Sequence, residues 1–271
     1  MSFAPRYVPL DSKGWRLAMG LRPLDLAQWL EVDEHRDEEL ALKSRLLESS
    51  YDAVVATNPQ GDEASGELLE EIRANLGTYH RALANTQSPP GHPIVDASRL
   101  VQEDLCVLVR EDTWRLRAAC VCFPSRWDLG TKIGTTLDDI HQPVPGYDDH
   151  LARPTTLFFD RLQPDRSFWR LNWTLLDSPD LFQPARARRA PAGDPTRWSF
   201  RVERQTLRSL PRTGAVVFTI RTYVTSATAM CEHDDTFASA LVHALETAPP
   251  DVQAYKGWTG VASALRDALG S

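Results

Sequence analysis

The hydrophobic periodicity of this 271-residue chain changes at Ser88-Pro89-Pro90-Gly91, and that change constrains the fold more than any other feature. Before it, residues 24–83 carry apolar side chains at helical spacing, for example Leu68, Ile72 and Leu76. After it, apolar residues form strand-like runs that are separated by short helical stretches. We expect strands over 105–109, 114–123, 168–176, 198–207 and 215–225, helices over 127–140 and 149–162, and C-terminal helices over 236–246 and after Val261.

Two strands, a helical crossing and a three-strand meander form the element order of a PAS fold. We therefore predict an α+β fold, with a PAS-like antiparallel sheet, helices on one face of it, and an N-terminal helical extension. Residues 1–98 are expected to form the extension and to pack on a core of residues 99–271, within one compact domain. In such a fold, a ligand lies between the inner sheet face and the last crossing helix.

Charge and cysteine content narrow the partners and the compartment. The net charge of −7 argues against a nucleic-acid partner, which requires a surplus of Lys and Arg on one face. None of the four cysteines forms a CxxC pair, so no zinc knuckle or iron–sulfur centre is indicated. No apolar run approaches the ~20 residues of a membrane span, and Met1–Pro9 lack the pattern of a signal peptide. We expect a cytoplasmic, reduced protein without membrane contact.

A basic cluster interrupts the region between the third and fourth expected strands. Arg186, Arg188 and Arg189 lie among Ala and Pro residues, a composition typical of an exposed loop.

Among the seven histidines, His141 has the position most typical of a ligand-binding residue. It lies at the C-terminal end of the short helical region 127–140, directly before Pro143 and Pro145. The proximal histidine of haem-binding PAS domains comes from the last helix before the third strand, and we assign His141 to that place. A neutral imidazole is a good haem-iron ligand. The alternative is a histidine at a helix end, stabilised by the helix dipole. Arg126 and Lys132 precede it and could contact two haem propionates, or could simply lie on a solvated helix face.

Polar residues occur on both faces of the last two expected strands. Arg201, Glu203 and Gln205 alternate along one strand, and Thr219, Arg221 and Tyr223 along the next. A buried Glu203 or Arg221 must be paired, either at a ligand or in salt bridges on a wet sheet face. Glu103 and Asp104 open the first strand and either cap it or reach the rim of a pocket.

Eight short peptides form a series along the chain. They are GLRPLD (20–25), LVQEDL (100–105), CFPSRW (122–127), KIG (132–134), IHQPVPGY (140–147), RLNW (170–173), the stretch 203–223, and YKG (255–257). The stretch 203–223 contains ERQTL, LPRTG and FTIRTY. In this order, over roughly residues 20–258, the chain resembles the haem-dependent oxidative N-demethylase family.

The resemblance implies a PAS-fold α subunit that binds haem b and provides an axial ligand to the haem iron. In the activity of that family, haem-bound dioxygen and electrons from NADPH convert dimethylamine to methylamine and formaldehyde. The flavin and iron–sulfur groups that supply the electrons lie in separate reductase partners. The family motif and the position together assign the axial iron ligand to His141.

The substrate contacts follow less directly, and Glu203, Arg204, Arg221 and Glu103 are the candidate catalytic residues. Arg221 or Arg204 would donate hydrogen bonds to the bound dioxygen. Glu203 or Glu103 would hold a small protonated amine by a charge-assisted hydrogen bond. Two alternatives stay open: a non-catalytic haem-PAS gas sensor or haem-binding protein, and a haem oxygenase of the same fold that acts on another substrate.

Overall fold

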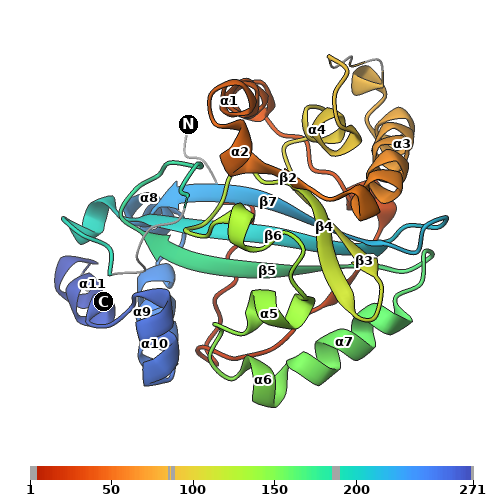
Figure 1. Cartoon of the computed structure of the whole chain (residues 1–271). Coiled ribbons are helices and arrows are strands. Elements are labelled where there is room, and N and C mark those ends of the chain that lie inside the picture. The colour runs from red at the N-terminus through yellow and green to blue at the C-terminus, as the bar shows by residue number, and fades with distance from the viewer. Residues whose placement is uncertain (1–4, 85, 87–88, 185–189, 270–271) are drawn as a thin grey trace.

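The structure is a computed structural model, and it describes residues 5–84, 86, 89–184 and 190–269. Seven strands form one antiparallel sheet in the order β1-β5-β6-β7-β3-β4-β2 (Figure 1). The strands are β1 (Arg22–Leu24), β2 (Val55–Thr57), β3 (Asp104–Arg110), β4 (Trp114–Cys120), β5 (Ser167–Leu176), β6 (Ser199–Ser209) and β7 (Val216–Ser226).

The five central strands are those that the sequence predicts. A hairpin of β3 and β4 is followed by a meander of β5, β6 and β7, and β3 pairs with β7 to join the two units. The α+β prediction is confirmed. The helices are α1 (Arg36–Ser49), α2 (Tyr51–Val54), α3 (Asp62–Tyr79), α4 (Pro93–Ser98), α5 (Leu137–His141), α6 (Tyr147–His150), α7 (Ala152–Arg161), α8 (Ala227–His233), α9 (Phe237–Thr247), α10 (Pro250–Lys256) and α11 (Val261–Leu269).

Different helices cover the two faces of the sheet (Figure 1). On one side, which we call the extension face, Leu105, Val107 and Cys120 pack in one apolar cluster with Leu68 and Ile72 of α3. On the other side, the crossing face, the alternate strand residues pack against the helices between β4 and β5. That cluster includes Cys106, Leu108, Leu116, Ala119, Leu137, Phe159 and Leu162.

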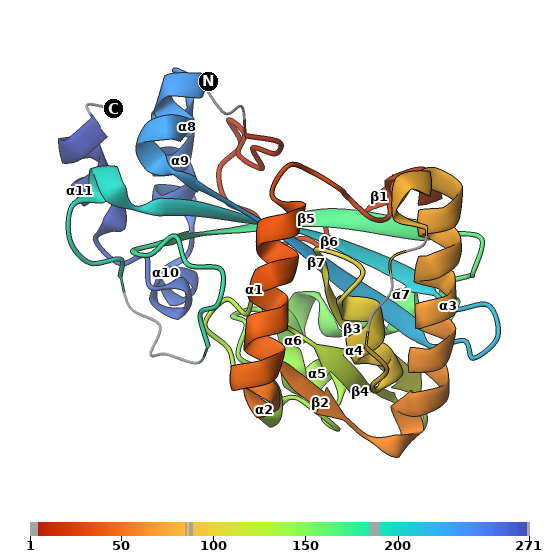
Figure 2. The same ribbon diagram turned by 90° about the horizontal axis from the view of Figure 1, so that it is seen from above.

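The C-terminal helices form a third group at one end of the sheet, away from α1 and α3 (Figure 2). Leu175, Phe200 and Val202 extend from β5 and β6 into an apolar cluster with Leu241 of α9 and with Trp258. The outer edge of β5 is paired with β1 only at Ser167–Trp169, so the rest of that edge has no neighbouring strand. The C-terminal group places α10 beside this unpaired part of β5.

The N-terminal region is less continuously helical than its periodicity predicts. Residues 24–35 form no α-helix, and Val55–Thr57 form a strand that pairs with β4. The helical prediction for 24–83 is therefore wrong at these two places, and at Val55–Thr57 the reason is that pairing with a sheet edge overrides local propensity. Arg186, Arg188 and Arg189 lie outside the described residues. Within the described part of the chain, no helix combines the length and apolar character needed to span a membrane.

Candidate functional site

Helix α5 places His141 beside the crossing face. Thr136 and Asp139 form a reciprocal capping box: the Thr136 hydroxyl accepts from the Asp139 amide at 3.0 Å, and the Asp139 carboxylate accepts from the Thr136 amide at 3.2 Å. Leu137 in its first turn anchors the helix in the crossing-face cluster. Gly146, at φ 74°, then turns the chain into α6, where a side chain would approach Leu17 at 3.0 Å.

The imidazole of His141 is prepared to act as a metal ligand. Its Nδ1 lies 2.8 Å from the Leu137 carbonyl oxygen, so Nδ1–H is the donor and Nε2 keeps its lone pair. The ring stacks on Tyr147, with 5.1 Å between centroids and 17° between planes. Burial lowers the pKa of His141, more than the Leu137 carbonyl raises it, which keeps the ring neutral near pH 7.

Strands β5 and β6 place five polar side chains on the crossing face opposite α5. Arg170 pairs in register with Gln205, and Asn172 with Glu203. The Asn172 and Gln205 side-chain amides both donate to Glu203 Oε2, at 3.1 and 3.0 Å. Arg201 Nε lies 3.7 Å from Glu203 Oε1. Glu203 is thus a nearly buried carboxylate (9% exposed) with a fixed orientation.

Arg170 differs from the other charged groups on this face. Within the described residues, its guanidinium has no hydrogen-bond or ion-pair partner, and its Nε is buried. Burial lowers the pKa of Arg170, and the charge of Glu203 opposes this only in part. The charges of Arg170 and Lys132 both contribute to lowering the pKa of His141.

A further cation reaches this face from α10. Lys256 Nζ donates to Asn172 Oδ1 at 3.3 Å and to the Trp173 carbonyl at 3.2 Å. It therefore supports the residue that holds Glu203.

The two expected propionate contacts have different surroundings. Lys132 is half-buried and lies near His141. Arg126 is engaged within the protein, because its Nη2 lies 2.5 Å from Asp177 Oδ1. Arg126 is also the one non-glycine residue with a positive φ, 57°, in the described part of the chain.

Three of the four candidate catalytic residues lie on the extension face and not beside His141. Arg221 contacts Glu39 Oε2 at 2.8 Å and Asp33 Oδ2 at 2.6 Å. Arg204 donates to the Gln28 carbonyl at 2.5 Å, and Glu103 accepts from the Glu31 amide at 2.8 Å. These residues fasten the N-terminal segment to the sheet.

This placement corrects the expected grouping of the candidates. The sheet separates Arg221, Arg204 and Glu103 from His141, and only Glu203 shares the crossing face with it. The reason is alternation, since neighbouring residues such as Glu203 and Arg204 point to opposite faces of a strand.

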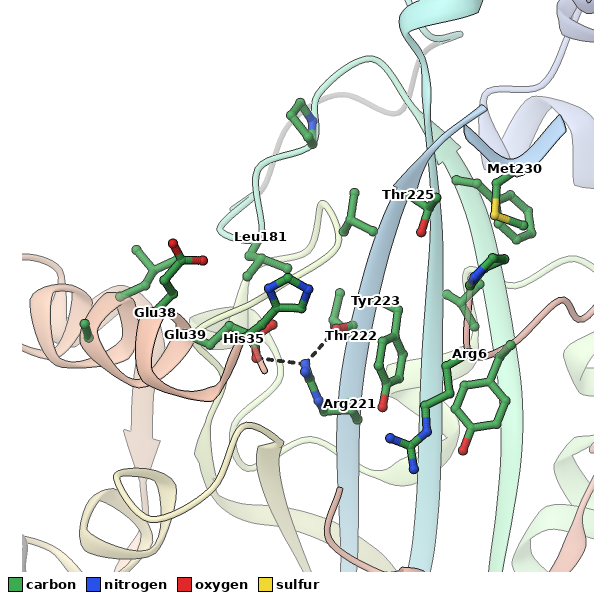
Figure 3. A pocket seen from close by; sticks show the side chains of 18 of the residues that line it. Arg6, His35, Glu38, Glu39, Leu181, Arg221, Thr222, Tyr223, Thr225 and Met230 are labelled. Carbon is green, nitrogen blue, oxygen red and sulfur yellow. Dashed lines mark hydrogen bonds and ion pairs between the residues drawn. The ribbon is translucent and has the colours of Figure 1, made fainter. Parts of the chain in front are cut away.

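A cavity of about 560 Å³ also lies on the extension face (Figure 3). Arg221 and Tyr223 of β7 line it from below, and His35, Glu39 and Arg6 approach it from the N-terminal segment and α1. The Tyr223 hydroxyl donates to Glu31 at 2.5 Å. Because the sheet lies between them, this cavity is separate from the surroundings of His141.

Arg170, Asn172 and Lys256 were not among the candidate residues from sequence. All three lie in peptides that carried the family resemblance, RLNW and YKG, and this was the available signal. Their role could not be read from those peptides because it depends on strand register and on the docking of α10.

The fold and the site together define an α+β protein with a candidate ligand site between one sheet face and the crossing helices. A family model described as haem-dependent oxidative N-demethylase, alpha subunit-like, matches residues 20–266. The match spans most of the chain, so the chain belongs to this family.

The residues of the crossing face fit a haem. His141 offers an unpartnered Nε2 on a neutral ring, as an axial iron ligand requires. Ile133, Ile140, Phe158 and Phe168 are half-buried on the same side and could contact an apolar macrocycle. The orphaned guanidinium of Arg170 provides a cation that no described protein group neutralises.

Proposed function

We propose that this chain binds haem b through His141 and catalyses the oxidative N-demethylation of a small secondary amine. The supporting observation is the neutral imidazole, whose Nδ1–H is bound by the Leu137 carbonyl while Nε2 faces no described partner. Bound haem would supply the activation of dioxygen. The strand order, with β3 of the hairpin beside β7 of the meander, supports the PAS-like interpretation of the fold.

The overall reaction consumes one dioxygen, two electrons and two protons for each secondary amine. It yields the primary amine, formaldehyde and water. The electrons would come from NADPH through a separate flavin and iron–sulfur reductase.

Glu203 is the residue we propose to bind the substrate. A secondary amine is protonated near pH 7, and its ammonium group would donate to the carboxylate of Glu203. Asn172 and Gln205 hold this carboxylate in one orientation, so the amine would be presented from a fixed direction. Arg221, Arg204 and Glu103 have no part in this step, because they lie on the other face.

The test is formaldehyde release from a panel of methylated amines by haem-loaded protein with a chemical or enzymatic reductant. Glu203→Gln should weaken amine binding about ten- to a hundredfold, the loss of one charged hydrogen bond, while haem affinity changes little. Glu232→Gln, an exposed carboxylate on α8, is the matched control. Equal loss of haem and amine binding in Glu203→Gln would contradict the assignment. Haem binding without formaldehyde from any amine would leave a non-catalytic haem protein or an oxygenase for another substrate.

A further inference from the structure

We propose that Arg170 binds a carboxylate group of the molecule that occupies the crossing face, and that this group is a haem propionate. The anion site is formed by a residue of the sheet itself. The identification of the anion as a haem propionate rests on the proposed function.

Most of the cations around the site contact oxygen atoms of the protein itself. Arg126 contacts Asp177, and Lys256 donates to Asn172 and to a backbone carbonyl. Arg201 donates to the carbonyls of Phe123 and Leu181. Each of these cations is engaged by protein oxygens. Arg170 differs from these three cations, because its guanidinium has no hydrogen-bond or ion-pair partner among the described residues and its Nε is buried. The half-buried Lys132 likewise has no side-chain partner among the described residues, but it lies on a loop and not on the sheet.

Glu203 does not serve as a hydrogen-bond or ion-pair partner of Arg170. Its Oε2 already accepts from Asn172 and Gln205, and its Oε1 faces Arg201. No ion pair joins it to Arg170 within the described residues, although its charge opposes the effect of burial on the pKa of Arg170. Arg170 therefore keeps a full set of donors on the crossing face.

An unpaired, half-buried guanidinium lowers the stability of a protein, because the charge is partly removed from water without compensation. Such a group is explained when a ligand supplies the missing anion. The planar fork of arginine N–H donors matches a carboxylate, which can accept two parallel hydrogen bonds.

The position of Arg170 indicates which ligand would carry the carboxylate. Arg170 follows Phe168 on the same face of β5, and Phe168 packs in one cluster with Leu137 and Ile140 of the helix that carries His141. A molecule held at Nε2 of His141 would therefore lie beside the strand that carries Arg170. Haem has an iron for the imidazole and two propionates at its edge. Arg126, which the sequence favoured for this role, is already paired with Asp177.

The experiment is a spectrophotometric titration of the haem-free full-length protein with haem and with haem dimethyl ester, in which both carboxylates are masked. Arg170→Gln should weaken haem binding about tenfold or more, the loss of a charge-assisted contact. The same substitution should leave affinity for the ester within about threefold of wild type. Arg166→Gln, which removes an exposed cation just before β5, should bind both compounds like the wild type.

Two results would overturn the assignment while haem binding itself stands. One is wild-type haem affinity in Arg170→Gln. The other is an equal loss of affinity for haem and for the ester, which would indicate a packing role. If wild-type protein binds neither compound, the proposed function fails, and the propionate assignment fails with it.

Thermal unfolding of the haem-free protein gives an independent readout. Because Arg170 is unpaired there, Arg170→Gln should leave the melting temperature unchanged or raise it. A clear drop would show that the guanidinium is satisfied within the protein, and would contradict the proposal without any measurement of haem.

Discussion

At the scale of single residues, burial controls the charge of His141. The pKa of His141 is lower in the folded state than in the unfolded state, where it is about 6.5. Below pH 6.5, the two states therefore bind different numbers of protons at this residue. The unfolded state binds more protons there, so His141 contributes stability that is complete above this pH. That contribution is lost as the pH falls through the lowered pKa of the folded state.

We therefore expect the haem-free wild type to lose stability relative to His141→Gln as the pH falls from about 7 to 5. Urea unfolding of both proteins over this range measures the difference in the free energy of unfolding. The difference between two proteins removes the contributions of the other histidines and of the carboxylates. If the difference in the free energy of unfolding did not change with pH, burial would not lower the pKa of His141.

Residue-level reasoning from sequence named His141, Glu203 and the arginines as candidates but could not tell which of them share a face of the sheet. Strand alternation predicts that Glu203 and Arg204 point to opposite faces. It does not say which face lies beside the helix that carries His141. That depends on how the crossing helices close over the sheet, which is set by contacts such as those of Leu137 and Phe159.

At the scale of elements, the segment before α1 is held to the sheet by a buried ionic contact. Arg221 is fully buried and binds both Asp33 and Glu39. Arg221→Gln should lower the free energy of unfolding by about 3–5 kcal/mol, because it leaves buried carboxylates unpaired. The haem affinity of the folded variant should stay near that of the wild type, since Arg221 lies on the other face.

The matched control is Arg266→Gln, whose side chain is 47% exposed and pairs with the equally exposed Glu246. A surface pair of this kind should contribute less than about 1 kcal/mol. Chemical denaturation measures both substitutions. If Arg221→Gln changed the free energy of unfolding little but abolished haem binding, Arg221 would belong to the functional site after all.

Elements with a long periodic pattern were predictable, and short ones were not. The five central strands were predicted near their observed bounds because each carries an apolar or alternating run of several residues. By contrast, β1 and β2 have three residues each, and their conformation comes from pairing with β5 and β4. A three-residue strand carries too little pattern to be distinguished from a loop or a helix end.

At the scale of the whole molecule, the N-terminal 98 residues complete the sheet as well as cover it. They contribute both outer strands and the helical half of the extension-face cluster. We expect a fragment of residues 99–271 to lack a cooperative unfolding transition, because it would expose that cluster and leave Arg204 and Arg221 unpaired. Circular dichroism during thermal unfolding, beside the full chain, tests this. A sharp transition in the fragment would show that the core is an independent domain.

The most direct test of the central claim is the visible absorption spectrum of the protein during titration with haem. Wild-type protein should develop a strong Soret band that saturates at one haem per chain. His141→Ala should lose or shift that band, whereas His150→Ala, an exposed histidine at the end of α6, should behave like the wild type. The same band in His141→Ala as in the wild type, or no saturable band in the wild type, would contradict haem ligation by His141.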